Sequence, residues 1–135
     1  MDKKSVLIVA GPGEVREGIK ALLEAIPDIG LVETFSPLAL AETDIKKLFP
    51  ELIILDPTHE DVDCRKMLSQ FRQQLPCIKV LAIVDKEEEK EECRIEGVDA
   101  TLVKGFRGQS FVSAVGNLLE KDRERCLEDS QGDRG

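Results

Sequence analysis

The residue best suited to chemistry is Asp56, a carboxylate that follows four consecutive aliphatic residues, 52–55. A short apolar run that ends in a charge is typical of a buried parallel strand, and open α/β folds bind their ligands at the carboxyl ends of such strands. The run therefore predicts that Asp56 lies at a ligand-binding edge. An alternative of equal weight is that Asp56 opens a turn, as Asp before Pro57-Thr58 commonly does.

A positive charge, Lys104, follows another short predicted strand, 100–103. The carboxyl ends of parallel strands meet at one edge of a sheet, so we expect the Lys104 ammonium to lie within ion-pair distance of the Asp56 carboxylate. The single histidine, His59, lies in a polar stretch and is expected to be solvated.

The elements that must position these residues alternate between strands and helices. Aliphatic or β-branched runs predict strands, and apolar residues spaced three and four apart predict amphipathic helices. The predicted strands cover 6–9, 31–35, 52–56, 78–84 and 100–103, and the predicted helices cover 15–26, 38–48, 67–75, 86–96 and 111–119. Parallel strands need crossover helices, so five such units predict an α/β fold with helices on both faces of a parallel sheet. Right-handed crossovers favour the flavodoxin-like strand order 2-1-3-4-5.

Composition indicates one globular domain with protein partners. The chain has 135 residues, 41% of them hydrophobic, which suits a single core within residues 1–120. Residues 121–135 are polar, so we expect a disordered tail or a linker stub there. A net charge of −8 disfavours binding of nucleic acid or anionic lipid by this domain itself.

Cysteine spacing and hydropathy give an expected location. The four cysteines are widely spaced without a C-x-x-C pair, so we expect reduced thiols, three of them packed as small hydrophobes. The sequence has no signal peptide and no apolar stretch near 18 residues, so we expect a soluble cytoplasmic protein with no membrane contact.

Several motifs resemble the receiver domain of two-component response regulators, in the branch that carries a helix-turn-helix. The resemblance spans residues 5–119 and rests on Val6-Leu7-Ile8-Val9, Val15-Arg16-Glu17-Gly18, Leu55-Asp56, Val62-Asp63, Gly97-Val98-Asp99-Ala100 and Leu102-Val103-Lys104. It implies phosphorelay signalling in which Asp56 accepts a phosphoryl group from a histidine kinase and Lys104 pairs with the phosphate. It also implies that Thr58 lies in the acceptor loop, and that an output domain regulates transcription.

The departures from the receiver pattern lie at the functional positions. Receivers have two adjacent acidic residues after the first strand, which hold Mg²⁺, and the matching residues here are Ala10 and Gly11. The hydroxyl residue that ends the fourth strand and drives switching is matched by Val84, and the aromatic residue of the fifth strand by Thr101. Mg²⁺ needs about six oxygen ligands and is usually anchored by one or two carboxylates, so we expect weak Mg²⁺ binding or none.

The favoured hypothesis is therefore an atypical receiver that works through protein–protein interaction and is not an enzyme. It needs no cofactor, and Lys104 serves to neutralise Asp56 as a structural ion pair. The expected partners are a histidine kinase, an output domain or a second copy of the chain. The glutamate-rich stretch 86–96 is either a solvated helix face or an acidic docking surface for such a partner.

Two other hypotheses stay open. In the second, Asp56 is an active phosphoacceptor, and Lys104 stabilises the transferred group electrostatically. In the third, the chain is a flavodoxin-like module that binds a small molecule at the turn 11–13. Pro12 weakens the third hypothesis because it has no N–H to offer an anion.

Overall fold

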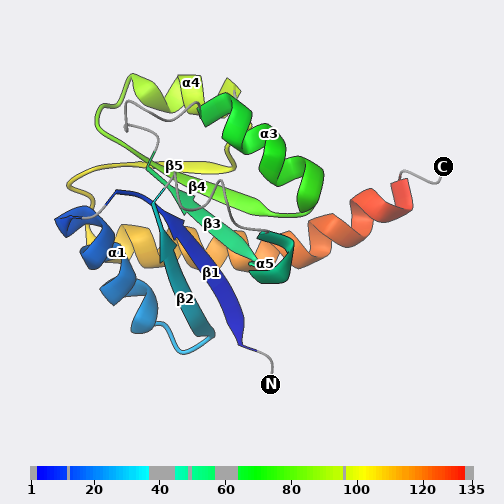
Figure 1. The fold of residues 1–135 in the computed structure, drawn as a ribbon, viewed down its shortest axis with the longest axis horizontal. Coiled ribbons are helices and arrows are strands. Elements are labelled where there is room, and N and C mark those ends of the chain that lie inside the picture. Colours follow the sequence, from blue (N-terminus) through cyan, green and yellow to red (C-terminus); the bar gives the residue numbers. More distant parts are fainter. Residues whose placement is uncertain are drawn as a thin grey trace.

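Strands and helices alternate along the chain in the computed structural model of the protein (Figure 1). The structure describes residues 3–11, 13–36, 45–48, 50–56, 64–95 and 97–132, with side chains for all of these except 45–46, 64–65, 95 and 121–132. The strands are β1 (Lys4–Val9), β2 (Ile29–Phe35), β3 (Leu52–Leu55), β4 (Lys79–Val84) and β5 (Ala100–Val103). The helices are α1 (Glu14–Glu24), α3 (Cys64–Gln74), α4 (Glu89–Ile95) and α5 (Gly108–Gly132), with a short 3₁₀ helix η1 (Ile45–Leu48).

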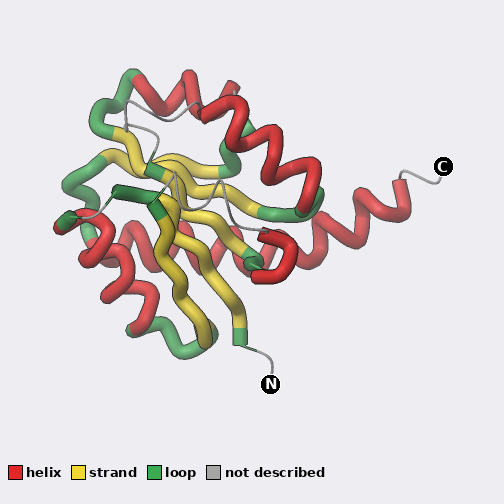
Figure 2. Tube along the Cα trace, viewed as in Figure 1, coloured by secondary structure: helices red, strands yellow, loops and turns green. Residues whose placement is uncertain are grey.

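The five strands form one parallel sheet in the order β2-β1-β3-β4-β5, which confirms the predicted flavodoxin-like topology. Helices α1 and α5 cover one face of the sheet, and α3 and α4 cover the other (Figures 1 and 2). All carboxyl ends of the strands therefore meet at one edge, between the two helical layers.

Two apolar clusters, one on each face of the sheet, form the core. Successive side chains of a strand point to opposite faces, so β1 sends Leu7 and Val9 toward α3 and α4, and Val6 and Ile8 toward α1 and α5. Strands β3 and β4 are buried along their whole length, as continuous aliphatic runs of a doubly covered parallel sheet should be. The central strands are thereby fixed in register, and so are the residues that leave their ends.

A set of polar contacts, which we call the Arg72–Asp99 clasp, joins α3 to the segment before β5. The Arg72 guanidinium donates to the carbonyl oxygens of Ile78 and of Gly97 (2.7 Å), and to Asp99 Oδ2 at 2.9 Å. Asp99 Oδ2 also accepts from the Val80 N–H at 2.8 Å. The clasp satisfies backbone groups at the edge of the sheet opposite Asp56.

Three expectations differ from the structure. Helix α5 continues to Gly132, so the expected disorder is wrong for residues 121–132, although their polar composition stands. Helix α4 begins at Glu89, three residues after the predicted start. Of the helix predicted over 38–48, residues 38–44 lie outside the described residues, and 45–48 form η1. Within the described residues, no helix combines the length and the apolar character that crossing a membrane requires.

The cysteine expectation is confirmed only in part. Cys93 is not disulfide-bonded and is buried in the cluster beneath α3 and α4, in agreement with its predicted role as a small hydrophobe. Cys77 takes part in a disulfide bond, so the expectation of reduced thiols is wrong at that position.

Candidate functional site

Asp56 lies where predicted, immediately beyond the end of β3. Its backbone N–H donates to the carbonyl oxygen of Val9 at 3.0 Å, which continues the pairing of β3 with β1 by one residue. The side chain is 17% exposed, so the carboxylate sits at the edge of the core and still reaches solvent.

Lys104 and Asp85 leave the ends of two neighbouring strands side by side. The last pair between β4 and β5 is Val84 with Val103, so Asp85 and Lys104 are the next residues on each strand. The Lys104 N–H also donates to the Val84 carbonyl oxygen at 2.8 Å. This register places the two side chains opposite each other.

The Lys104 ammonium contacts two carboxylates. Its Nζ atom lies 3.4 Å from Asp56 Oδ2, which confirms the predicted ion pair, and 2.7 Å from Asp85 Oδ1. Our reading of the sequence missed Asp85. The available signal was its position, because a charged residue directly after the buried strand 78–84 must emerge at the same edge as Asp56.

The pKa of Lys104 reflects these contacts. Partial burial lowers the pKa, but the hydrogen bond to Asp85 and the negative charges of Asp56 and Asp85 together raise it above the ordinary value for lysine. Lys104 is therefore a cation at neutral pH. The three side chains carry a net charge of −1 when all are ionised.

The residues at the expected metal positions, Ala10 and Gly11, have no carboxylate for Mg²⁺. Ala10 is buried, with a methyl side chain in the apolar cluster beneath α1 and α5, and Gly11 has no side chain. The carboxylates of Asp56 and Asp85 both contact the Lys104 ammonium. Among the described residues no group of three or more His, Cys, Asp or Glu side chains is arranged to hold a metal. Thr58, the remaining predicted site residue, lies outside the described residues.

The two other departures from the receiver pattern are Val84 and Thr101, which lie on neighbouring strands. Val84 is fully buried and packs in the cluster beneath α3 and α4. Thr101 is half-buried on β5 opposite Ala82. Neither offers a side chain that resembles the family's switching pair, because valine has no hydrogen-bonding group and threonine has no ring.

The turn that precedes α1 gives the small-molecule hypothesis little support. Gly13 is the N-cap residue of α1 and has φ 152°, and no side chain caps this end of the helix. Glu14 and Glu17 occupy the first turn, where their charges oppose an incoming anion. Pro12 lies outside the described residues.

Helix α4 and the residues before it form an exposed acidic surface, as predicted. Four of its glutamates are exposed: Glu87, Glu88, Glu91 and Glu92. Within it, Lys90 pairs with Glu87 at 3.1 Å, and Arg94 pairs with Glu91. Among the described side chains of α4, that of Cys93 is buried.

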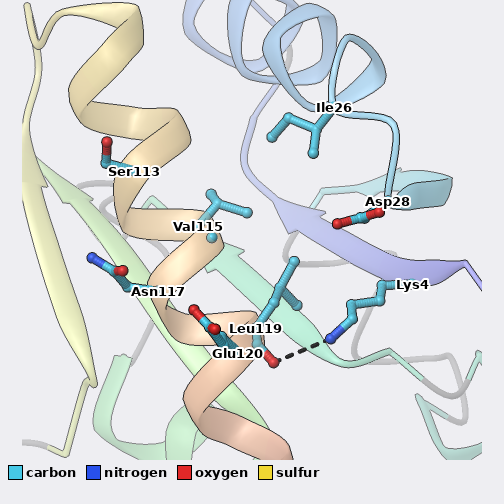
Figure 3. A pocket seen from close by; sticks show the side chains of 9 residues that line it. Lys4, Ile26, Asp28, Ser113, Val115, Asn117, Leu119 and Glu120 are labelled. Carbon is cyan, nitrogen blue, oxygen red and sulfur yellow. Dashed lines mark hydrogen bonds between the residues drawn. The ribbon is translucent and has the colours of Figure 1, made fainter.

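A separate hollow of about 610 Å³ lies at the opposite edge of the sheet, between α5 and the start of β1 (Figure 3). Lys4 crosses it, and its Nζ atom donates to the carbonyl oxygen of Leu119 at 3.2 Å. Asp28 and Glu120 line the hollow but lie far from Asp56 along the strands. We therefore treat it as part of the packing between β1 and α5.

Comparison with known proteins points to one family. No protein-family model matches the sequence. The response regulator protein VraR of Staphylococcus aureus is 33% identical over 112 residues, which cover 82% of this chain and 54% of VraR. The chain thus spans about half the length of the curated relatives it matches.

Solved structures show the same fold. A CheY-like receiver domain from Methanospirillum hungatei JF-1 has a TM-score of 0.76 at 18% identity, covering 91% of this chain and 98% of that one. The beryllofluoride-activated NtrC4 receiver domain has a TM-score of 0.74 at 22% identity, covering 87% and 98%. The sheet order, shared with the CheY-like receiver domain, and the similarity to the response regulator VraR support a receiver domain of the response-regulator kind.

Proposed function

We propose that this receiver domain signals by binding protein partners and undergoes little or no Mg²⁺-dependent phosphorylation. The observation that carries the proposal is the end of β1, where Ala10 and Gly11 offer no carboxylate. On this proposal the domain is not an enzyme and has no cofactor of its own.

The chemistry of phosphoryl transfer explains why the missing carboxylates at the end of β1 matter. Proteins catalyse it mainly by positioning the reactants and by neutralising charge on the transferred oxygens, and metal ions supply much of that neutralisation. Among the described residues, the positive charge beside Asp56 is the Lys104 ammonium, which Asp85 also contacts. A phosphodonor, itself an anion, would approach a site whose net charge is already negative.

One observation favours the alternative, an active phosphoacceptor. Lys104 Nζ lies 3.4 Å from Asp56 Oδ2, close enough to contact a group attached to that oxygen. The alternative therefore requires that Asp56 react without the carboxylates that usually anchor the metal.

The relatives suggest the kinds of partner. VraR is a response regulator of which this chain matches 54%, and the activated NtrC4 receiver domain is a dimer. We infer that this domain associates with an output domain, with a histidine kinase or with a second copy of itself, and that it serves transcription regulation in the cytoplasm. A disulfide such as that at Cys77 is unusual in the cytoplasm, where thiols are kept reduced. Thiol labelling in a rapidly quenched lysate tests the location, because a cytoplasmic protein should have Cys77 reduced.

The proposal is tested with a small phosphodonor. The purified protein is incubated with acetyl phosphate, with and without Mg²⁺, and its intact mass is measured. We expect no Mg²⁺-dependent mass increase. Stoichiometric labelling that needs Mg²⁺ and disappears in Asp56→Asn would establish the phosphoacceptor alternative instead.

A further inference from the structure

Of the two carboxylates on Lys104, Asp85 makes the closer contact. The distance of 2.7 Å between Lys104 Nζ and Asp85 Oδ1 is that of a charge-assisted hydrogen bond, whereas 3.4 Å to Asp56 Oδ2 is an ion-pair distance. Asp85 is also the more exposed partner, at 48% against 17% for Asp56. Asp85 therefore occupies the solvent side of the ammonium, from which a dissolved anion would approach.

The backbone fixes this contact. Asp85 and Lys104 follow the last paired residues of β4 and β5, and the Lys104 N–H donates to the Val84 carbonyl oxygen. Gly105 has φ 93°, a left-handed conformation that favours glycine, and turns the chain directly after Lys104. The pair thus needs no rearrangement of either strand.

Hydrogen bonds link the segment after Asp85 to the start of α4. After Asp85, the Lys86 N–H donates to the Glu89 carboxylate at 2.9 Å, and the Glu89 N–H returns to the Lys86 carbonyl oxygen at 3.1 Å. Residues 85–88 are therefore held at one end by Lys104 and at the other by the first residue of α4. A change in the Asp85–Lys104 contact would reach the acidic surface of α4 through four residues.

We propose that Asp85 takes the place of a phosphoryl group on Lys104, so that its carboxylate holds the connection from β4 to α4 against the end of β5 while Asp56 stays unmodified. This inference deepens the proposed function: the acidic surface of α4 is presented to partners permanently, and not in response to a phosphorylation signal. Asp85 is a positioning residue, since it acts through Lys104.

A competition follows between Asp85 and any dissolved phosphate. An anion that binds Lys104 must displace the Asp85 carboxylate or lie beside it, and both arrangements cost electrostatic free energy. Removing the Asp85 charge should therefore raise the affinity of Lys104 for inorganic phosphate, by about threefold to tenfold for a partly exposed pair.

The test is an NMR titration of ¹⁵N-lysine-labelled protein with inorganic phosphate, without Mg²⁺ or a phosphodonor. The signal of the Lys104 ammonium, assigned with Lys104→Arg, is followed in wild type and Asp85→Asn. The matched control is Glu88→Gln, which removes one negative charge from the same connection, at an exposed residue. We expect tighter phosphate binding in Asp85→Asn only, together with faster amide hydrogen exchange over residues 85–90.

Equal phosphate affinities in the three proteins would overturn the inference, as would unchanged hydrogen exchange in Asp85→Asn. Should Asp85→Asn fold poorly, Asp85→Ser and the charge-retaining Asp85→Glu replace it, and Asp85→Glu must behave as wild type. The outcome is independent of the proposed function, because acetyl phosphate labelling of the wild type decides that question in a separate sample.

Discussion

At the scale of single residues, the site is defined by one cation between two carboxylates. Lys104 binds Asp56 and Asp85, and Ala10 and Gly11 stand where a metal-binding receiver has acidic residues. The Lys104 ammonium thus neutralises one of the two negative charges from within the chain. On the proposed function, Lys104 and Asp56 form a structural ion pair and do not serve Mg²⁺-dependent phosphoryl transfer.

The raised pKa of Lys104 predicts a pH-dependent contribution to stability. Because the pKa is higher in the folded state than the ordinary 10.5, the contribution is complete below that value and is lost as the pH rises through the folded-state pKa. We expect Lys104→Gln to lower the free energy of unfolding by about 1 kcal/mol near neutral pH. Urea unfolding of both proteins should show the difference in free energy of unfolding narrowing as the pH rises beyond the ordinary lysine pKa of 10.5. A difference that stays constant through that range would refute the assignment.

The sequence predicted Asp56 and Lys104 but not Asp85, because it shows where each strand ends and not which strand ends are paired. Asp56 and Lys104 each follow an apolar run, so strand periodicity alone locates them at one edge. Asp85 also follows a predicted strand. A helix is predicted from Lys86 onward, which leaves Asp85 as a connecting residue, so its contact with Lys104 was not predicted. Its contact with Lys104 depends on the register between β4 and β5, which only the folded sheet specifies.

At the scale of elements, the start of α1 depends on Gly13. Its φ of 152° is a backbone conformation that side chains rarely adopt. Gly13→Ala should therefore lower the free energy of unfolding by about 1–3 kcal/mol. Gly18 is the matched control, because it lies in the interior of α1 with open space around it, and Gly18→Ala should stabilise by about 0.5–1 kcal/mol. Thermal unfolding that shows the same sign for both variants would contradict this account.

The Arg72–Asp99 clasp joins α3, β4 and the approach to β5. Arg72→Ala removes the guanidinium that donates to two backbone carbonyls and to the Asp99 carboxylate, so we expect a loss of about 2 kcal/mol in the free energy of unfolding. Arg94→Ala, which removes a fully exposed pair with Glu91, should leave the stability nearly unchanged. Urea titration of the two variants checks this, and equal losses would show that the clasp adds nothing beyond a surface pair.

At the scale of the whole molecule, the sequence predicted the topology because its buried strands are nearly continuous apolar runs. The runs at β1, β3 and β4 leave few arrangements for five parallel strands. The length of α5 was missed because polar residues after 120 were judged by what they could bury. Glutamate, lysine, arginine and leucine are strong helix formers, and they extend a helix that Phe111 and Val115 anchor to the sheet.

The central claim is that the end of β1, and not the loss of Asp56 or Lys104, keeps this receiver domain from Mg²⁺-dependent phosphorylation. The most direct test compares wild type with the double variant Ala10→Asp, Gly11→Asp, each incubated with acetyl phosphate and Mg²⁺ and measured by intact mass. Circular dichroism of the double variant checks that a carboxylate at the buried position 10 leaves the fold intact. We predict no label on wild type and a Mg²⁺-dependent label on the double variant that Asp56→Asn abolishes. Equal Mg²⁺-dependent labelling of wild type and double variant would contradict the claim.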